Sequence, residues 1–304
     1  MTRQGGDHIE LDDDALKAVA NGTRLRLVES LGEAVEGGGY GTRRFSELMT
    51  EVGLSDSGRM AYHLDKLRKQ AYVERTDDGY RLTLRGLRIY QFVRSGVLSR
   101  SPEVGPFETD LLHEACGNPL SIRYENQRVC GICETCGVTV ESVPVRPSSF
   151  DPDRLETLER AMQRQLWAEN FTLTQGCCLH CGGTVETDFR SPHEDGGDGA
   201  SVDGPQVLFV CNVCHWFHTA GVAYAGYLHP AVVAFCHERD LDIREHHLLD
   251  PPVDVPRPEV RSEDPWRVAV TYAYENDAIT LTFDDDLTVH SVTTQQGGAA
   301  SPQA

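Results

Sequence analysis

Cysteine is missing from the first 115 residues of this 304-residue chain, and all ten cysteines lie between Cys116 and Cys236. Its most apolar stretch, residues 220–235, is interrupted by His229 and Pro230 and is too short for a clean membrane-spanning helix. Residues 1–14 lack the basic start and apolar core of a secretory signal. We therefore expect a cytoplasmic protein with no membrane partner, in which paired cysteines bind metal rather than form disulfides.

Motifs of the common enzyme classes are also absent. The chain has no phosphate-binding glycine loop, no nucleophile elbow and no metalloprotease motif. Its "HEAC" segment at residues 113–116 lacks the spacing of histidine and glutamate found in zinc deaminases. The sequence therefore predicts a protein that is not an enzyme.

Positive charge is scarce overall, since the formal net charge is −19, but it is unevenly distributed. Residues 1–100 hold 16 Lys and Arg against 15 Asp and Glu, whereas residues 101–304 hold 12 against 32. Only three of the 28 basic residues are lysines, and short acidic runs recur, as at residues 12–14 and 284–286. Such a surface is typical of extreme halophiles. At the high salt concentration inside these cells, the release of counterions from DNA contributes little to the affinity of a protein for DNA. A moderate basic balance in the N-terminal third is thus compatible with a DNA partner.

The N-terminal third contains a regular series of helix and strand signals. Asn21 is a predicted cap for a helix with Leu25, Val28, Leu31 and Val35 on one face, which ends at the glycine run 37–39. Thr42 is the predicted cap for a second helix, 43–52, which Gly53 ends.

A third helix, a hairpin and a last helix follow. Ser55 or Asp56 can cap a helix that runs to about residue 70, with Met60, Leu64 and Leu67 as its buried stripe. Residues 72–76 and 80–84 are predicted strands joined at Asp77-Asp78-Gly79, and residues 85–98 form the last helix. This order of elements indicates a winged helix-turn-helix.

Two stretches, "NGTRLRLVESL" and "FSELMTEVGLSDSGRMAYHLDKLRKQAYVERTDDGYRLTLRG", resemble ArsR-like winged helix-turn-helix transcription regulators, particularly those of halophilic archaea. The resemblance covers about 90 residues. It implies a homodimer that binds operator DNA through a recognition helix, 57–68, and a wing, 72–84. The winged region has no cysteine, which makes metal sensing at this domain doubtful.

The candidate DNA contacts are the positions of this chain that match the DNA-contacting positions of the family. Arg59 is the strongest candidate for reading a guanine, because a guanidinium can donate two parallel hydrogen bonds to one base edge. The candidate base-reading residues are Ser57, Gly58, Arg59, Ala61 and Tyr62. The candidate phosphate contacts are Arg43, Arg44, Lys66, Arg75 and Arg81. Apolar stripes in residues 11–19 and 87–97 could form the dimer contact or simply close the monomer core.

The first cysteine-rich segment has the spacing of a zinc ribbon. His113-x2-Cys116-Gly and Cys133-x2-Cys136-Gly form two knuckles separated by sixteen residues, and strands at 120–124 and 128–131 can form the hairpin between them. Cys130 is an alternative fourth ligand to His113, although a redox thiol or a small buried side chain is also compatible with its position.

A second cysteine-rich segment repeats the pattern. Cys178-x2-Cys181 and Cys211-x2-Cys214 form its predicted ligand set, and the interval contains an Asp- and Gly-rich stretch, 194–204, expected to be a flexible insertion. Other residues could substitute as ligands: Cys177, His180, His215 and His218. Cys236 is more compatible with a core position. Four-ligand sites predict about two structural zinc ions per chain, which this region needs in order to fold.

These signals predict an α+β multidomain chain with a winged helix-turn-helix, two zinc ribbons and a C-terminal β-hairpin. The remaining parts are an amphipathic helix that packs across the ribbons, a proline-rich connector at 250–265 and strands at 266–274 and 278–283. The predicted boundaries are a winged domain at 1–100, zinc ribbon 1 at 106–146, a helical connector at 147–176, zinc ribbon 2 with its insertion and helix at 177–249, a connector and hairpin at 250–290, and a disordered tail at 291–304.

Taken together, the sequence predicts a sequence-specific DNA-binding transcription regulator. Its acidic C-terminal half is an expected surface for dimerisation, an effector or a protein partner. The alternative is a zinc-ribbon interaction factor of the transcription machinery, in which the winged domain docks a protein instead of DNA.

Overall fold

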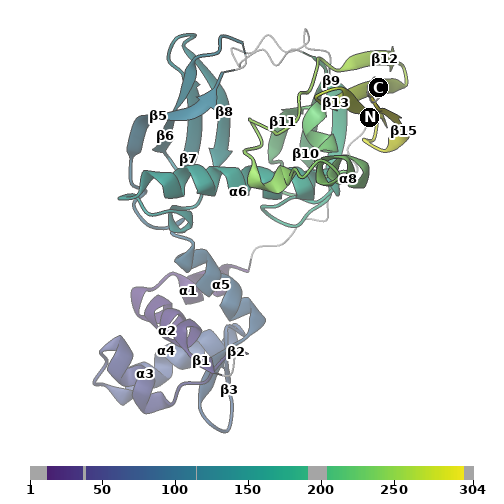
Figure 1. Cartoon of the computed structure of the whole chain (residues 1–304). Coiled ribbons are helices and arrows are strands. Elements are labelled where there is room, and N and C mark those ends of the chain that lie inside the picture. The colour runs from purple at the N-terminus through teal and green to yellow at the C-terminus, as the bar shows by residue number, and fades with distance from the viewer. Residues whose placement is uncertain (1–11, 37–38, 114, 191–203, 298–304) are drawn as a thin grey trace. The chain divides into compact units, whose positions relative to one another are not determined.

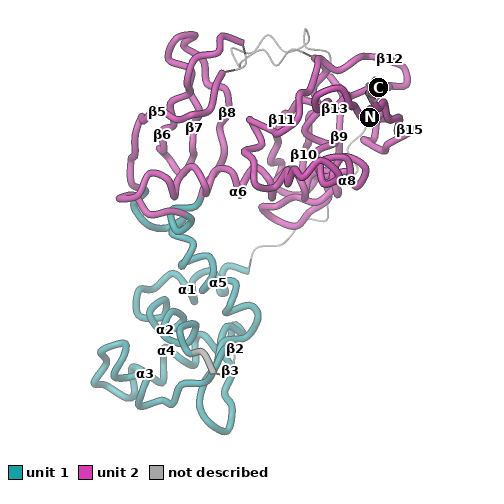
Figure 2. Tube along the Cα trace, viewed as in Figure 1, with its two compact units in different colours: residues 1–101, 146–149 teal, residues 102–145, 150–304 magenta. Residues whose placement is uncertain are grey.

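The computed structural model describes residues 12–36, 39–113, 115–190 and 204–297 (Figure 1). This part of the chain contains eight α-helices and several antiparallel sheets, so the predicted α+β class is confirmed. The chain divides into two compact units (Figure 2). Unit 1 comprises residues 1–101 and 146–149, and unit 2 comprises residues 102–145 and 150–304. No helix among the described residues is long and apolar enough to cross a bilayer.

Unit 1 is mainly helical, with two short hairpins. Its elements are α1 (Asp13–Val19), α2 (Gly22–Glu33), β1 (Val35–Glu36), β2 (Gly39–Tyr40), α3 (Phe45–Val52), α4 (Ser57–Lys69), β3 (Val73–Arg75), β4 (Tyr80–Leu82), α5 (Leu84–Arg94) and the 3₁₀ turn η1 (Pro147–Ser149). One apolar core joins the helices and the β3–β4 hairpin, with Leu27, Leu31 and Met60 fully buried at its centre.

The helix boundaries of unit 1 follow from side-chain caps. Asn21 Oδ1 accepts hydrogen bonds from the backbone N–H groups of Thr23 and Arg24, as the sequence predicts. Asp56 caps α4, since its Oδ1 accepts from the N–H groups of Gly58 and Arg59. Gly53 ends α3 with φ = 72°, the left-handed conformation that glycine adopts without steric cost.

Three boundary predictions in unit 1 are wrong. Helix α5 ends at Arg94 and not at the predicted residue 98, shortly before Gly96 with φ = 78°. Helix α2 ends at Glu33, and Val35 lies in strand β1 instead of on the helix. Thr42 does not cap α3. The helix begins after Arg44, whose backbone N–H donates to a carboxylate oxygen of Glu47 at 2.8 Å. Residue 43 is held instead by a backbone bridge to Tyr80 of β4, which draws it out of the helix.

The described residues of unit 2 form three antiparallel sheets. The first has the order β5-β6-β7-β8, with β5 (Val104–Leu112), β6 (Pro119–Glu125), β7 (Arg128–Cys133) and β8 (Val138–Pro144). The second has the order β11-β10-β9, with β9 (Val185–Arg190), β10 (Gln206–Cys211) and β11 (Phe217–Gly221). The third has the order β12-β13-β14-β15, with β12 (Glu259–Glu263), β13 (Trp266–Tyr274), β14 (Asp277–Asp284) and β15 (Val289–Gln295).

Helix α6 (Leu155–Thr174) runs past the first two sheets (Figure 1). The shorter helices of unit 2 are α7 (Val222–Gly226), α8 (Pro230–His237) and the 3₁₀ turn η2 (Ile243–Glu245). One large apolar core contains Tyr124 of the first sheet, Met162 and Leu166 of α6, Phe209 of the second sheet and Tyr272 of the third. The apolar periodicity of α6 therefore serves to join the sheets, as the sequence indicates.

The C-terminal part differs from the prediction of a lone hairpin and a disordered tail. Strands β13 and β14 do form a hairpin, but β12 and β15 flank it on either side. Strand β12 lies within the predicted connector, and β15 extends to residue 295, so the tail prediction is wrong for 291–295. Residues 191–203 and 298–304 lie outside the described residues, and with them all but the last residue of the predicted insertion, 194–204. Both edge strands are almost wholly exposed. They therefore lack the alternation of apolar and polar residues from which a strand can be predicted.

Candidate metal centres

Cluster 1, formed by His113, Cys116, Cys133 and Cys136, lies at one end of the first sheet of unit 2. His113 and Cys116 belong to the turn between β5 and β6, while Cys133 ends β7 and Cys136 lies in the turn to β8. Because β5, β6, β7 and β8 are neighbours in register, these two turns meet at the same end of the sheet. The four potential ligand atoms all lie within 4.8 Å of one another.

The internal distances of cluster 1 are those of side chains that converge on one point. His113 Nδ1 lies 3.3 Å from Cys116 Sγ, and Cys116 Sγ lies 3.6 Å from Cys133 Sγ. His113 and Cys133 are buried, whereas Cys116 and Cys136 are exposed, so the site is at the surface with one side closed by protein. This arrangement could hold a metal ion.

Cluster 2, formed by Cys178, Cys181, Cys211 and Cys214, has the same construction in the second sheet. Cys178 and Cys181 precede β9, while Cys211 ends β10 and Cys214 lies in the turn to β11. Cys178 Sγ is 3.7 Å from Cys214 Sγ, and Cys181 Sγ is 3.4 Å from Cys211 Sγ. All four sulfur atoms lie within 4.8 Å of one another, and all ten cysteines of the chain are free of disulfides.

All four knuckles close with the same backbone turn. The residue after the second ligand donates its N–H to the carbonyl of the first ligand and has a positive φ. Three of these residues are glycines, Gly117, Gly137 and Gly182, with φ between 68° and 74°. The fourth is His215, with φ = 58°. Glycine at this position thus favours the left-handed backbone that lets two side chains converge, because it adopts that conformation without steric cost.

Backbone N–H groups also point at the sulfur atoms. The N–H of Cys136 lies 3.4 Å from Cys133 Sγ, and the N–H groups of Val213 and Cys214 lie 3.4 and 3.5 Å from Cys211 Sγ. Burial alone raises the pKa of Cys211, but these donors outweigh it and lower that pKa to about 7. Hydrogen bonds from Asn118 lower the pKa of Cys116 to about 6. One cysteine of each cluster is thus arranged as a thiolate, the form that binds metal. Hydrogen bonds with Cys116 and Cys133 raise the pKa of Cys136 to about 12, and burial raises that of Cys214 to about 12, so the remaining protons have to leave as a metal ion binds.

The alternative ligands of the sequence lie outside the clusters. Cys130 Sγ contacts Ser142 Oγ at 3.6 Å, and Cys236 is buried in the core as predicted. His215 serves the backbone turn described above. His218 stacks on Trp216 with ring centroids 5.7 Å apart, and burial lowers its pKa to about 4. Cys177, which precedes the knuckle, also stands outside the four sulfur atoms of cluster 2.

A buried carboxyl group on α6 accompanies cluster 2, and sequence reasoning missed it. Glu169 is 2% exposed, accepts a hydrogen bond from Gln165 at 2.7 Å and lies 3.6 Å from His180 Nε2. Burial raises the pKa of Glu169 to about 7. Its position could have been found, since it continues the apolar stripe of Leu158, Met162, Leu166 and Leu173.

In unit 1, most of the candidate DNA contacts on α4 lie on its exposed face, opposite the buried Met60, Leu64 and Leu67. The exposed candidates are Ser57, Gly58, Arg59, Ala61, Tyr62, Lys66, Arg44, Arg75 and Arg81. Arg43 is half-buried, with Nε 3.5 Å from Glu51. Arg81 pairs with Glu74 at 2.5 Å, and Lys66 lies over the Tyr62 ring. The side chain of Arg59 makes no hydrogen bond or ion pair with any described residue, while its backbone N–H donates to the Asp56 cap.

Comparisons with known families agree with the division of the chain. Residues 12–93 match a domain of unknown function (DUF7347), and residues 114–289 match a second domain of unknown function (DUF7351). No curated protein and no solved structure matches the chain. The second match contains seven of the eight residues of the two clusters and spans more than half of the chain. The chain therefore belongs to the DUF7351 family.

Proposed function

We propose that the chain is a sequence-specific DNA-binding transcription regulator, with unit 1 as a winged helix-turn-helix. The observation that carries the proposal is the exposed face of α4, on which Arg59 and Tyr62 stand out from a helix whose other face is buried. Helix α3, the turn at Gly53 and helix α4 form the helix-turn-helix, and β3–β4 is the wing.

Several contacts hold this face rigid. The cap at Asp56 fixes the first turn of α4, which carries Ser57 to Met60. The wing is tied to the segment before α3 by the paired backbone hydrogen bonds of Arg43 and Tyr80, both 2.9 Å. Recognition of base edges needs side chains placed on rigid elements, because a displaced donor loses its hydrogen bonds to the base. Arg59 and the exposed cations Arg44 and Arg75 are accordingly available for DNA.

A homodimer is part of the proposal. Unit 1 exposes large apolar side chains on α1 and α5: Leu16 is 54% exposed, Leu84 71% and Phe92 46%. A dimer that covers these side chains would remove their apolar surface from water. Leu11, the first residue of the predicted dimer stripe, lies outside the described residues.

Zinc is the proposed metal of both clusters. Tetrahedral coordination with Zn–S bonds of about 2.3 Å places sulfur atoms about 3.8 Å apart. The sulfur distances of 3.4 to 3.7 Å are close to this value and far from the bond length of a disulfide, about 2.05 Å. With four side chains per ion, each site is closed, which supports a structural role.

The test of DNA recognition begins with selection of preferred duplexes from a random pool by the full chain, in molar potassium chloride. We expect a recurrent sequence to emerge. Arg59→Ala should then weaken binding to that duplex by about 5- to 150-fold, the range of one lost bidentate base contact of 1–3 kcal/mol.

Arg68→Ala is the matched control. Arg68 is an exposed arginine on the same helix, nine residues further on, which is half a turn away around the helix axis. It should leave affinity near the wild-type value. A pool that shows no enrichment, or wild-type affinity in Arg59→Ala, would contradict the proposal and favour a winged domain that docks a protein.

A further inference from the structure

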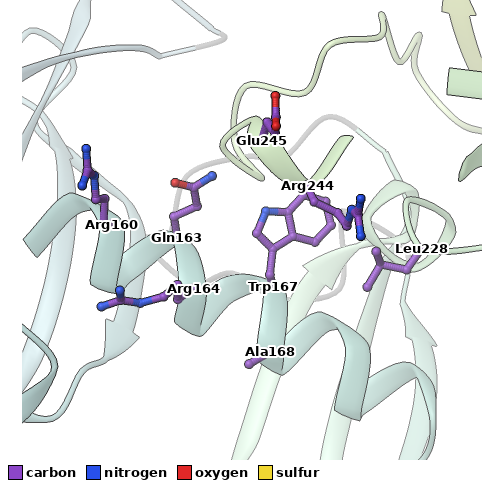
Figure 3. A pocket seen from close by; sticks show the side chains of 8 residues that line it. All are labelled: Arg160, Gln163, Arg164, Trp167, Ala168, Leu228, Arg244 and Glu245. Carbon is purple, nitrogen blue, oxygen red and sulfur yellow. The ribbon is translucent and has the colours of Figure 1, made fainter. Parts of the chain in front are cut away.

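Helix α6 borders an open pocket of about 690 Å³ within unit 2 (Figure 3). Residues of one helix face line it at positions i, i+3, i+4, i+7 and i+8: Arg160, Gln163, Arg164, Trp167 and Ala168. The other wall comes from Leu228 and from Arg244 and Glu245 of η2. The volume is within the range of small-molecule sites, about 300–1,000 Å³.

The centre of the pocket is held in place by one backbone carbonyl. Gln163 Nε2 and Trp167 Nε1 both donate to the carbonyl oxygen of His246, at 2.8 and 3.2 Å. Trp167 also packs edge-on against Tyr227, with ring centroids 6.3 Å apart. The half-buried indole ring therefore has a defined orientation beside Ala168 and Leu228, which gives the pocket a flat apolar surface.

Three arginines surround this surface, although residues 101–304 contain only 12 basic residues against 32 acidic ones. Arg160 and Arg164 lie to one side of Trp167, and Arg244 lies to the other (Figure 3). The side chain of Arg160 makes no hydrogen bond or ion pair with any described residue. Arg244 uses Nε and Nη2 to bind Asp242, so its guanidinium is oriented while Nη1 points elsewhere. This concentration of positive charge in an acidic unit requires an explanation.

We propose that this pocket binds a nucleoside phosphate. The base stacks on the Trp167 indole, and the phosphate group is held by Arg160 and Arg164. Along the helix, residues 160 and 164 precede Trp167 by about 10 and 5 Å, at 1.5 Å per residue. Those lengths match the span from a stacked base through its sugar to the phosphate. Base stacking on an aromatic side chain is worth about 1–3 kcal/mol per base.

A phosphate accounts for the charges better than a carboxylate does. A single carboxylate offers two acceptor oxygens, which one arginine satisfies in a bidentate pair. A phosphate group offers three acceptor oxygens and a charge of about −1.5 to −2, which two neighbouring arginines can share. Glu245 on the opposite wall repels an anion at its own end of the pocket and so favours the Arg160 and Arg164 side.

Isothermal titration calorimetry of the full chain with each of the four common nucleoside monophosphates tests the site. We expect at least one to bind in the micromolar to low millimolar range, and at least tenfold tighter than adenosine or inorganic phosphate alone. The double variant Arg160→Gln/Arg164→Gln should lower that affinity at least tenfold. Both side chains are exposed, so the fold should be kept, which circular dichroism checks.

Arg154→Gln is the matched control, because Arg154 is an exposed arginine at the start of the same helix and does not line the pocket. It should bind the nucleotide as the wild type does. The proposal is overturned if no monophosphate binds, if inorganic phosphate binds equally well, if only a single-stranded oligonucleotide binds, or if the double variant keeps wild-type affinity. DNA recognition by α4 is measured separately with Arg59→Ala, so either proposal can fail without the other.

Discussion

A single backbone position decides how each knuckle presents its ligands. In all four, the residue after the second ligand has φ between 58° and 74°, a region that costs non-glycine residues about 1–2 kcal/mol. Added Cβ atoms at Gly117, Gly137 and Gly182 would meet nothing within 4 Å, so the glycines are needed for their conformation rather than for space. His215 is the one non-glycine residue in this role, and it carries the strain.

Exchange at this position tests that account. His215→Gly should raise the free energy of unfolding by up to about 1 kcal/mol, because strain at a positive φ is relieved while chain flexibility partly offsets it. The matched change, Gly182→Ala, should lower it by about 1 kcal/mol. Urea unfolding followed by circular dichroism measures both, and both variants should retain two metal ions. Loss of metal from His215→Gly would mean that the imidazole is a ligand.

At the scale of elements, α6 holds unit 2 together and carries a carboxyl group where an apolar side chain is expected. The pKa of Glu169 is raised to about 7 because the side chain is buried. A folded-state pKa above the unfolded value means that stability is greatest below the unfolded pKa and falls as pH rises to the folded one. For Glu169 this window runs from about pH 4.5 to about pH 7.

Glu169→Gln removes this titration and keeps an oxygen to accept from Gln165. The variant should be more stable than the wild type by an amount that grows from pH 5 to pH 8 by on the order of 2 kcal/mol. Glu159→Gln, on the same helix but outside the buried stripe, should show no such trend. Equal stability of Glu169→Gln and wild type at pH 8 would show that the ionised carboxylate is compensated in the fold, for instance by His180.

Local signals explain which elements could be predicted from the sequence. Asn21, Asp56 and Gly53 act within a few residues of where they stand, so the helices of unit 1 and the knuckles were predictable. Strands β12 and β15 are exposed edge strands that form by pairing with β13 and β14. No local sequence pattern predicts them. Likewise, the spacing of Arg160 and Arg164 along α6 is visible in the sequence. That Arg244 of η2 lines the same pocket depends on the tertiary fold.

At the scale of the whole molecule, the two units are built on different principles. Unit 1 has no cysteine, and its own apolar core includes the fully buried Leu27, Leu48 and Leu67. Unit 2 contains all ten cysteines, and two of the three sheets formed by its described residues have a cluster at one end. When a metal site exists only in the folded state, the free energy of metal binding adds to the free energy of unfolding. Removal of metal should therefore destabilise unit 2 alone.

Chelation of zinc from the full chain tests this division. Amide hydrogen exchange should show loss of protection in β5 to β8 and β9 to β11, whereas α2 to α5 should keep their protection, because their core holds no metal ligand. Metal analysis supplies the control: Cys133→Ser should lower the content from two ions to one, and Cys130→Ser, outside cluster 1, should leave it at two. Unchanged exchange in unit 2 after complete removal of metal would show that the apolar core around α6 is sufficient for its fold, and parallel loss of protection in α2 to α5 would show that the stability of unit 1 depends on unit 2.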